Sequence, residues 1–163
     1  KELFNGEIDA TNLADAIAEF ERALVTYSRF DRFLEGDKNA LSQREQKGYR
    51  LFKEYGCIAC HNGVNLGGNL YQKFGLYKPY KQDFVGRYGV SGKEEDMYLL
   101  KVPTLKNIHY TYPYFHDGRE ANLLNVIRDM SEYQSGIVMK KEDAEDINLF
   151  LNTLSGDIPE IAK

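Results

Sequence analysis

Five consecutive residues carry the clearest chemistry in this sequence. Cys57, Ile58, Ala59, Cys60 and His61 form C-x-x-C-H, the pattern that attaches a c-type haem. Two thiols about one helical turn apart can each form a thioether with the same porphyrin, and the adjacent imidazole then points at the iron. One such motif predicts one covalently bound haem c, with His61 as an axial ligand.

Three other interpretations of this motif stay open from the residues alone. A thioredoxin-like redox pair would follow a strand and precede a helix, whereas here a helix is predicted first and Asn62-Gly63 follows. A structural zinc site would need a second pair of ligands, and only His109 and His116 remain to supply one. The third interpretation is a chance match.

The second axial position decides what a haem iron does, because the identity of that ligand separates electron carriers from proteins that bind peroxide or oxygen. The candidates are Met97, Met130, Met139, His109 and His116. Met97 follows a charged run at 93–96 and Met139 precedes two lysines, so both are expected at the surface or an edge. Met130 shares a helical face with Leu123 and Ile127, a pattern that is also typical of core packing.

Helices are predicted on the N-terminal side of the motif. Apolar residues at 13, 17, 20 and 24 recur at helical spacing, which predicts a helix over about residues 10–27. Residues 28–36 favour a short turn or helix, followed by a polar connector at 37–41. Ser42 and Glu45 fit a capping box, so another helix should begin there and run to Tyr55, with Gly56 ending it.

A further helix is predicted near the other end of the chain. Its apolar residues at 147, 150, 151 and 154 follow the helical period, and acidic residues at 143, 145 and 146 suit the positive end of a helix dipole. Gly156 and Pro159 should stop it.

Residues 62–118 have the composition of loops. They hold 8 of the 14 glycines, 3 of the 4 prolines and 8 of the 12 tyrosines. An irregular segment of this length is unusual inside a compact domain unless it is functional or wraps around something. Either a few short strands are present, or a large prosthetic group supplies part of the core.

The chain has the size and composition of one folded domain. Its 163 residues are 42% apolar, which is enough to fill a core without disulfides. A net charge of −4 gives no basic surface for nucleic acid, and no apolar run approaches the roughly 20 residues of a membrane span. The N-terminus lacks the order of a signal peptide, so the chain is predicted to be soluble and either mature or trimmed.

Several segments together resemble the C-terminal half of bacterial dihaem cytochrome c peroxidases, from about residue 10 to residue 159. They are the haem motif, 62–68, 86–88, 101–107 and 111–118, with 28–33 and 150–156 also similar. The resemblance implies a mainly α, cytochrome-c-like domain, with helices at both ends and long Gly/Tyr-rich loops. It also implies that the haem is the high-potential, electron-transferring one, held by His61 and Met130. The related methylamine-utilisation enzymes have a tyrosine where this chain has Met130.

The resemblance implies a partner domain that is missing here. In the family an N-terminal domain with its own C-x-x-C-H reduces hydrogen peroxide, whereas this chain has one motif. We therefore expect a single haem domain over 1–163, with a helical lead-in at about 1–41, a haem-binding core at 42–163 and no catalytic residue. A small cytochrome c or cupredoxin would supply electrons in the periplasm, and the resemblance leaves a homodimer open. The alternatives are a free-standing monohaem carrier, and a domain that binds gas or peroxide at a vacated sixth position.

Calcium is a further implication of the resemblance. In the family the ion lies between the two haem domains, and the ligands from this half would be the backbone carbonyls of Thr111 and Pro113. Calcium needs about 6 to 8 oxygens, so the site should be empty or weak without the other domain. His116 is expected near the haem or as a core histidine, and His109 at the surface. Lys106 replaces a family arginine and is assigned no role.

Overall fold

The computed structural model describes residues 9–80 and 83–162. It is mostly helical, which confirms the predicted fold class. The α-helices are α1 (Ala10–Ala23), α2 (Arg29–Leu34), α3 (Gln43–Glu54), α4 (Tyr88–Ser91), α5 (Leu123–Ser135) and α6 (Lys141–Asn152). Short 3-10 helices are η1 (Cys57–Ala59), η2 (Glu94–Asp96), η3 (Ile108–Tyr110) and η4 (Glu160–Ala162).

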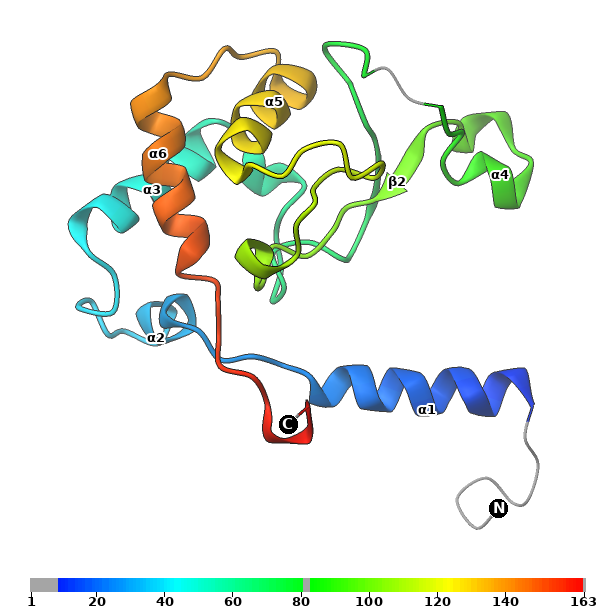
Figure 1. The fold of residues 1–163 in the computed structure, drawn as a ribbon, viewed down its shortest axis with the longest axis horizontal. Helices are drawn as coiled ribbons and strands as arrows, with labels where there is room; N and C mark the ends of the chain where they lie inside the picture. The colour runs from blue at the N-terminus through cyan, green and yellow to red at the C-terminus, as the bar shows by residue number, and fades with distance from the viewer. Residues whose placement is uncertain (1–8, 81–82, 163) are drawn as a thin grey trace.

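Helices α3, α5 and α6 form the body of the protein (Figure 1). The predicted capping box at the start of α3 is confirmed, because Ser42 accepts a hydrogen bond from the Glu45 amide and the Glu45 carboxylate accepts one from Ser42 N. Phe150 of α6 is fully buried, and its ring lies 5.3 Å from that of Phe52 on α3. Burial of large apolar side chains between these helices provides most of the stabilisation.

The contact between α3 and α6 is close because Gly48 has no side chain. A Cβ added at Gly48 would lie 2.6 Å from the carbonyl carbon of Asp146, and nearer still to its oxygen. Atoms of the backbone cannot move aside without shifting the helix. Arg44 and Lys47, in the turn of α3 before Gly48, both pair with the Asp146 carboxylate, at 2.6 Å and 2.7 Å.

We expect Gly48→Ala to destabilise the protein by roughly 1–3 kcal/mol, the usual cost of forcing atoms into a packed core. The gain in helix propensity from the same change, up to about 1 kcal/mol, acts in the opposite direction. Gly89→Ala in α4 is the matched control, because a Cβ there meets only Val85 Cγ2 at 3.4 Å. Thermal unfolding of the haem-loaded protein measures both, and equal stability of the two variants would contradict the role of Gly48.

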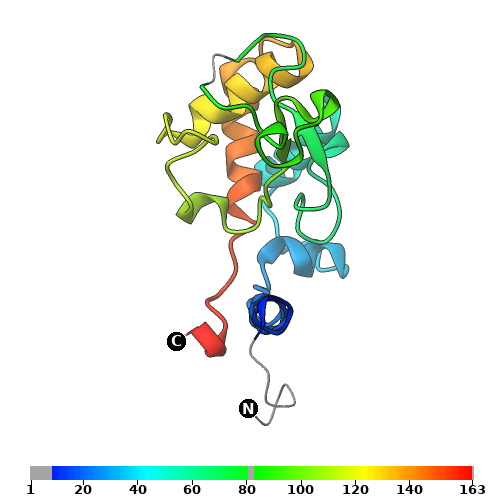
Figure 2. The same ribbon diagram turned by 90° about the vertical axis from the view of Figure 1, so that its right-hand side faces the viewer.

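Helix α1 is shorter than predicted and lies apart from the body. Asp9 caps it by accepting a hydrogen bond from Asn12 N, and it ends at Ala23 rather than near residue 27. Beyond it the chain becomes extended, and Ser28 both caps α2 and pairs with Gly156 in an antiparallel bridge. Figures 1 and 2 show α1 below the body, beside the C-terminal tail.

The apolar stripe of α1 is uncovered in this chain. Leu13, Ile17 and Phe20 are 58%, 51% and 48% exposed, and α1 has no buried side chain. By contrast α2 and the connector after it belong to the body, because Phe30 and Leu41 are each 3% exposed in the main core. Residues 1–8 of the predicted lead-in lie outside the described residues; within 9–41, helix α1 lies outside the core, whereas α2 and the connector belong to it.

Short strands are present in the loop-rich segment. β1 (Tyr71–Lys73) and β2 (Leu99–Lys101) form a two-stranded antiparallel sheet, with Gln72 opposite Leu100. The rest of the described part of 62–118 consists of turns and helices of no more than four residues. Among the described residues, no helix is both long and apolar enough to span a membrane.

Candidate haem-attachment site

A single tight turn brings the two cysteines and the histidine of the motif together. Helix α3 ends at Glu54, and Gly56 then takes a left-handed conformation (φ 79°) that directs the chain into η1. The backbone N–H groups of Cys60 and His61 both donate to the Cys57 carbonyl, at 3.3 Å and 2.9 Å. Both thiols are free rather than joined in a disulfide. The turn thus presents two thiols and an imidazole from five consecutive residues.

Cys57 lies on the inner side of this turn. It packs against the main hydrophobic core, and burial raises the pKa of its thiol to about 11. Burial thus favours an uncharged sulfur at this position, and a thioether to a porphyrin carries no charge.

His61 has the environment of an uncharged ligand histidine. Burial lowers the pKa of its imidazole and outweighs the backbone groups of Leu66 and Pro103, which act to raise that pKa. Its Nδ1 atom is buried and has no hydrogen-bond partner. A neutral ring is the form in which histidine binds a metal. The two free thiols and this ring therefore fit a covalently attached haem.

The Pro103 segment is held tightly beside His61. Gly67 has φ 132°, and a Cβ there would lie 2.8 Å from the carbonyl carbon of Pro103, so only glycine permits the approach. Gly68 N also donates to the Val102 carbonyl at 2.8 Å. The loop after the motif and the segment at 102–105 thus pack backbone against backbone.

The three methionines differ in their surroundings. Met130 is half-buried on α5, on the helical face that carries the buried Leu123 and Ile127. Met97 is half-buried at the end of η2. Met139 is only 3% exposed and belongs to the main core, so its expected surface or edge position is wrong. The neighbouring Val138 is 79% exposed, because the segment before α6 is extended and alternate side chains point in opposite directions.

The two remaining histidines have different surroundings. His109 is half-buried rather than at the surface, and its Nε2 lies 3.4 Å from the backbone oxygen of Asn148, which tethers η3 to α6. His116 is exposed, so it is not a core histidine. Its ring centroid lies 4.2 Å from that of Phe84. No hydrogen-bond pattern assigns either residue to the haem.

Thr111 and Pro113 are both exposed, on either side of Tyr112, and the Tyr112–Pro113 peptide bond is cis. A hollow of about 480 Å³ lies beside them, lined in part by His109, Tyr112 and Asn148. No group of three or more His, Cys, Asp or Glu side chains within 9–80 and 83–162 could hold a metal ion. Calcium at the two carbonyls stays a prediction.

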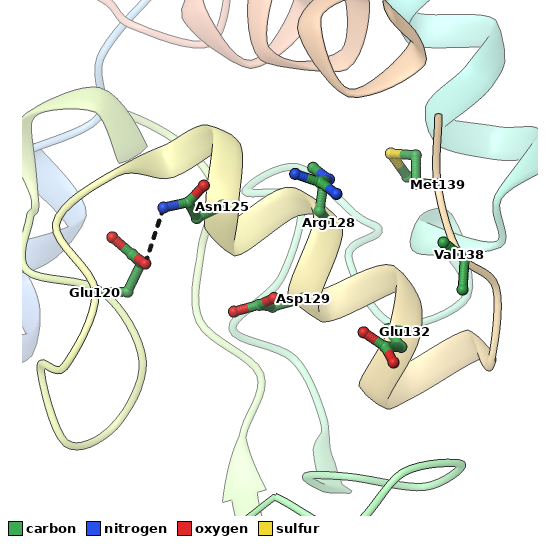
Figure 3. A pocket seen from close by; sticks show the side chains of 7 residues that line it. All are labelled: Glu120, Asn125, Arg128, Asp129, Glu132, Val138 and Met139. Atoms are coloured by element: carbon green, nitrogen blue, oxygen red, sulfur yellow. Dashed lines mark hydrogen bonds between the residues drawn. The ribbon is translucent and has the colours of Figure 1, made fainter. Parts of the chain in front are cut away.

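An acidic hollow that no sequence pattern indicated lies beside α5 (Figure 3). Its volume is about 280 Å³, and its lining residues are Glu120, Asn125, Arg128, Asp129, Glu132, Val138 and Met139. Burial raises the pKa of the Asp129 carboxyl, and the charges of Glu120 and Glu132 raise it further. The hollow contains none of the haem-motif residues.

Lys106 has a structural partner that no sequence pattern indicated. Its side chain is only 11% exposed, and its Nζ lies 2.6 Å and 2.5 Å from the two carboxylate oxygens of Asp31. The lysine that replaces the family arginine therefore joins the segment after Pro103 to α2.

The chain matches two family models in succession. The model described as di-haem cytochrome c peroxidase matches residues 1–39, and the model described as cytochrome c matches residues 45–155. The break between the two models comes between α2 and α3.

Named relatives match along almost the whole chain. A cytochrome c551 peroxidase of Nitrosomonas europaea is 49% identical over 94% of this chain and 47% of its own length. The cytochrome c peroxidase Ccp of Escherichia coli is 42% identical over 94% of the chain and 33% of its own length. The chain thus spans about half the length, or less, of these curated relatives. A crystal structure of a MauG-like protein associated with microbial copper homeostasis has a TM-score of 0.70 at 27% identity, covering 94% of this chain and 60% of that one.

Proposed function

Because the chain belongs to the cytochrome c family, and within it to the dihaem cytochrome c peroxidases, we propose that it is the electron-transferring haem domain of such an enzyme. The observation that carries the proposal is the turn at 57–61, where two free thiols and a buried imidazole nitrogen without a hydrogen-bond partner lie within five residues. A haem held there supplies a one-electron Fe(III)/Fe(II) couple.

Four side chains would hold the haem. Cys57 and Cys60 would anchor it through thioethers, and His61 and Met130 would bind the iron. A thioether ligand such as Met130 raises the reduction potential. With both ligands bound, the iron would have no open site for peroxide, and this chain would supply no catalytic residue of its own.

The peroxide-reducing haem would belong to a second, N-terminal domain of the same polypeptide. Two observations support this: the curated relatives are at least about twice as long, and the apolar stripe of α1 is uncovered. Leu13, Ile17 and Phe20 would pack against that domain, since burying such side chains fully gains roughly 1.5–3 kcal/mol each. The domain would also supply the remaining oxygens for calcium at Thr111 and Pro113.

In the whole enzyme, hydrogen peroxide would be reduced to two water molecules by two electrons and two protons. A small cytochrome c or cupredoxin would deliver the electrons one at a time to the haem of this domain. Since thioethers to haem are formed outside the cytoplasm, the compartment would be the periplasm or its equivalent. A free-standing monohaem carrier is the alternative, and the partial coverage of the relatives weighs against it.

The number of haems in the full-length polypeptide tests this proposal. We expect two covalently bound haems per polypeptide, and peroxide turnover with a reduced small cytochrome as donor. Intact mass under denaturing conditions counts the haems, and oxidation of the donor measures turnover. One haem per full-length polypeptide, with no turnover, would instead establish a monohaem carrier.

A further inference from the structure

Three segments that are far apart in the sequence are fastened together between α1 and the body. They are the chain just after α1 (26–31), the segment at 103–107 and the end of α6 with its tail (153–156). We call the side chains and glycine that join them the clasp: Thr26, Asp31, Lys106, Asn107 and Gly156. In Figure 1 the first and last of these segments run side by side between α1 and the body.

Lys106 forms the charged part of the clasp. Its ammonium group pairs with both oxygens of Asp31, and it lies 3.4 Å from Ser28 Oγ. Asp31 in turn accepts a hydrogen bond from Ser28 N at 2.7 Å and so caps α2. Burial acts to raise the pKa of Asp31, but the hydrogen bonds from Lys106 and Ser28 outweigh it and lower that pKa. The carboxylate is therefore fully charged at neutral pH and holds the lysine.

Asn107 forms the neutral part of the clasp. Its Nδ2 donates to Thr26 Oγ1 at 3.1 Å, and its Oδ1 accepts from Gly156 N at 3.0 Å. Its own backbone N–H donates to the Leu154 carbonyl at 3.3 Å. One side chain thus joins the two other segments directly. The left-handed conformation of Asn107 (φ 60°), which asparagine tolerates better than most residues, is needed for this arrangement.

The tail can join the clasp only because residue 156 is glycine. A Cβ at Gly156 would lie 2.7 Å from Thr26 Cβ and 2.8 Å from the Tyr27 carbonyl oxygen. Nearby, Phe30 N donates to the Thr153 carbonyl at 3.2 Å. The chain that leads out of α1 is therefore held on both sides.

The clasp is continuous with the candidate haem site. Gly67, in the loop after the haem motif, packs closely against the Pro103 carbonyl, and Leu105 N donates to the Leu66 carbonyl at 3.3 Å. The same short segment therefore contacts the loop after the haem motif and, through Lys106 and Asn107, holds the chain that leads out of α1. Since α1 has no buried side chain, its direction relative to the haem depends on this connection.

We propose that Lys106 and Asn107 are positioning residues that fix α1 relative to the haem-attachment turn, and thereby the distance between the two haem domains of the enzyme. The distance matters because the rate of electron transfer falls steeply with separation. This inference rests on the proposed function, because it assumes that α1 packs against the second domain.

Two substitutions in the full-length, haem-loaded enzyme test the inference. Asn107→Gly keeps the left-handed backbone and removes both side-chain hydrogen bonds. Lys106→Met keeps an apolar stem and removes the ion pair, whereas Lys106→Arg retains the charge and should restore the contact. Lys101→Met, at the exposed end of β2, is the matched control.

Amide hydrogen exchange, peroxide turnover and visible spectra are the three measurements. We expect the amides of Phe30 and Gly156 to exchange roughly tenfold faster in Asn107→Gly and Lys106→Met, equivalent to about 1.4 kcal/mol of lost local stability. In both variants kcat should fall several-fold, with the KM for peroxide and the visible spectrum unchanged. Lys106→Arg and Lys101→Met should behave as the unaltered enzyme.

Three results would overturn the inference. Faster exchange with unchanged kcat would show that the clasp only stabilises the fold. Unchanged exchange would show that these side chains do not fasten the segments. An altered spectrum would show that they act on the haem site itself. If the unaltered full-length protein held one haem and turned over no peroxide, the proposed function would fail, while exchange would still report whether the clasp exists.

Discussion

Replacing Met130 with alanine is expected to convert the iron of this domain from a low-spin to a high-spin state. The thioether would be lost from one axial position, and alanine cannot replace it as a ligand. The reduction potential should fall by on the order of 0.1 V, a modest part of the roughly 0.8 V over which axial ligands set haem potentials. Ferric visible spectra and a redox titration of the haem-loaded protein measure both changes.

Met139→Leu is the control for this experiment. Met139 is buried in the core at 3% exposure, so a change of similar volume there should cost less than about 1.5 kcal/mol and leave the iron unchanged. If Met130→Ala left the ferric spectrum as it was, Met130 would be a core residue of α5 and not a ligand. A spectral change in Met139→Leu alone would transfer the assignment to Met139.

Replacing both Cys57 and Cys60 with alanine is expected to abolish covalent haem attachment by this domain. The turn at 57–61 contains the two cysteines of the chain, and without them no thioether can form. In the full-length polypeptide the covalently bound haem should fall from two to one per chain. Extraction with acidified organic solvent followed by intact mass measures what remains bound.

Each single substitution provides the matched control. Cys57→Ala and Cys60→Ala each leave one thiol, so a single thioether should still retain the haem under denaturing conditions. The Cys57→Ala variant should be the less stable folded protein, because Cys57 packs against the core. Two covalent haems in the double variant would show that this turn does not carry one.

The motif, the helices next to it and the family could all be predicted from the sequence because each depends on local spacing. The capping box of α3, the stop at Gly56 and the five-residue haem motif lie within short stretches of chain. Their geometry follows from hydrogen bonds between residues no more than a few positions apart. The family resemblance combines several such stretches, and the comparisons confirm it.

Features that depend on distant parts of the chain could not be predicted in this way. The helix predicted over 10–27 stops at Ala23, and the chain beyond it is extended where Ser28 pairs with Gly156, a residue more than 120 positions later. Met139 is buried because its side chain packs in the main core, although two lysines follow Met139 in the sequence. His109 is half-buried because α6 lies beside η3.

The sequence by itself determined the haem chemistry that this chain can perform and the helices on either side of it. Only the tertiary structure decided which charged residues far apart in the sequence form pairs, such as Lys106 with Asp31. It also decided that the apolar face of α1 is left uncovered. The physical reason is that side-chain pairing and burial depend on which segments meet in space. Helical periodicity indicates that a face is apolar, but not what covers it.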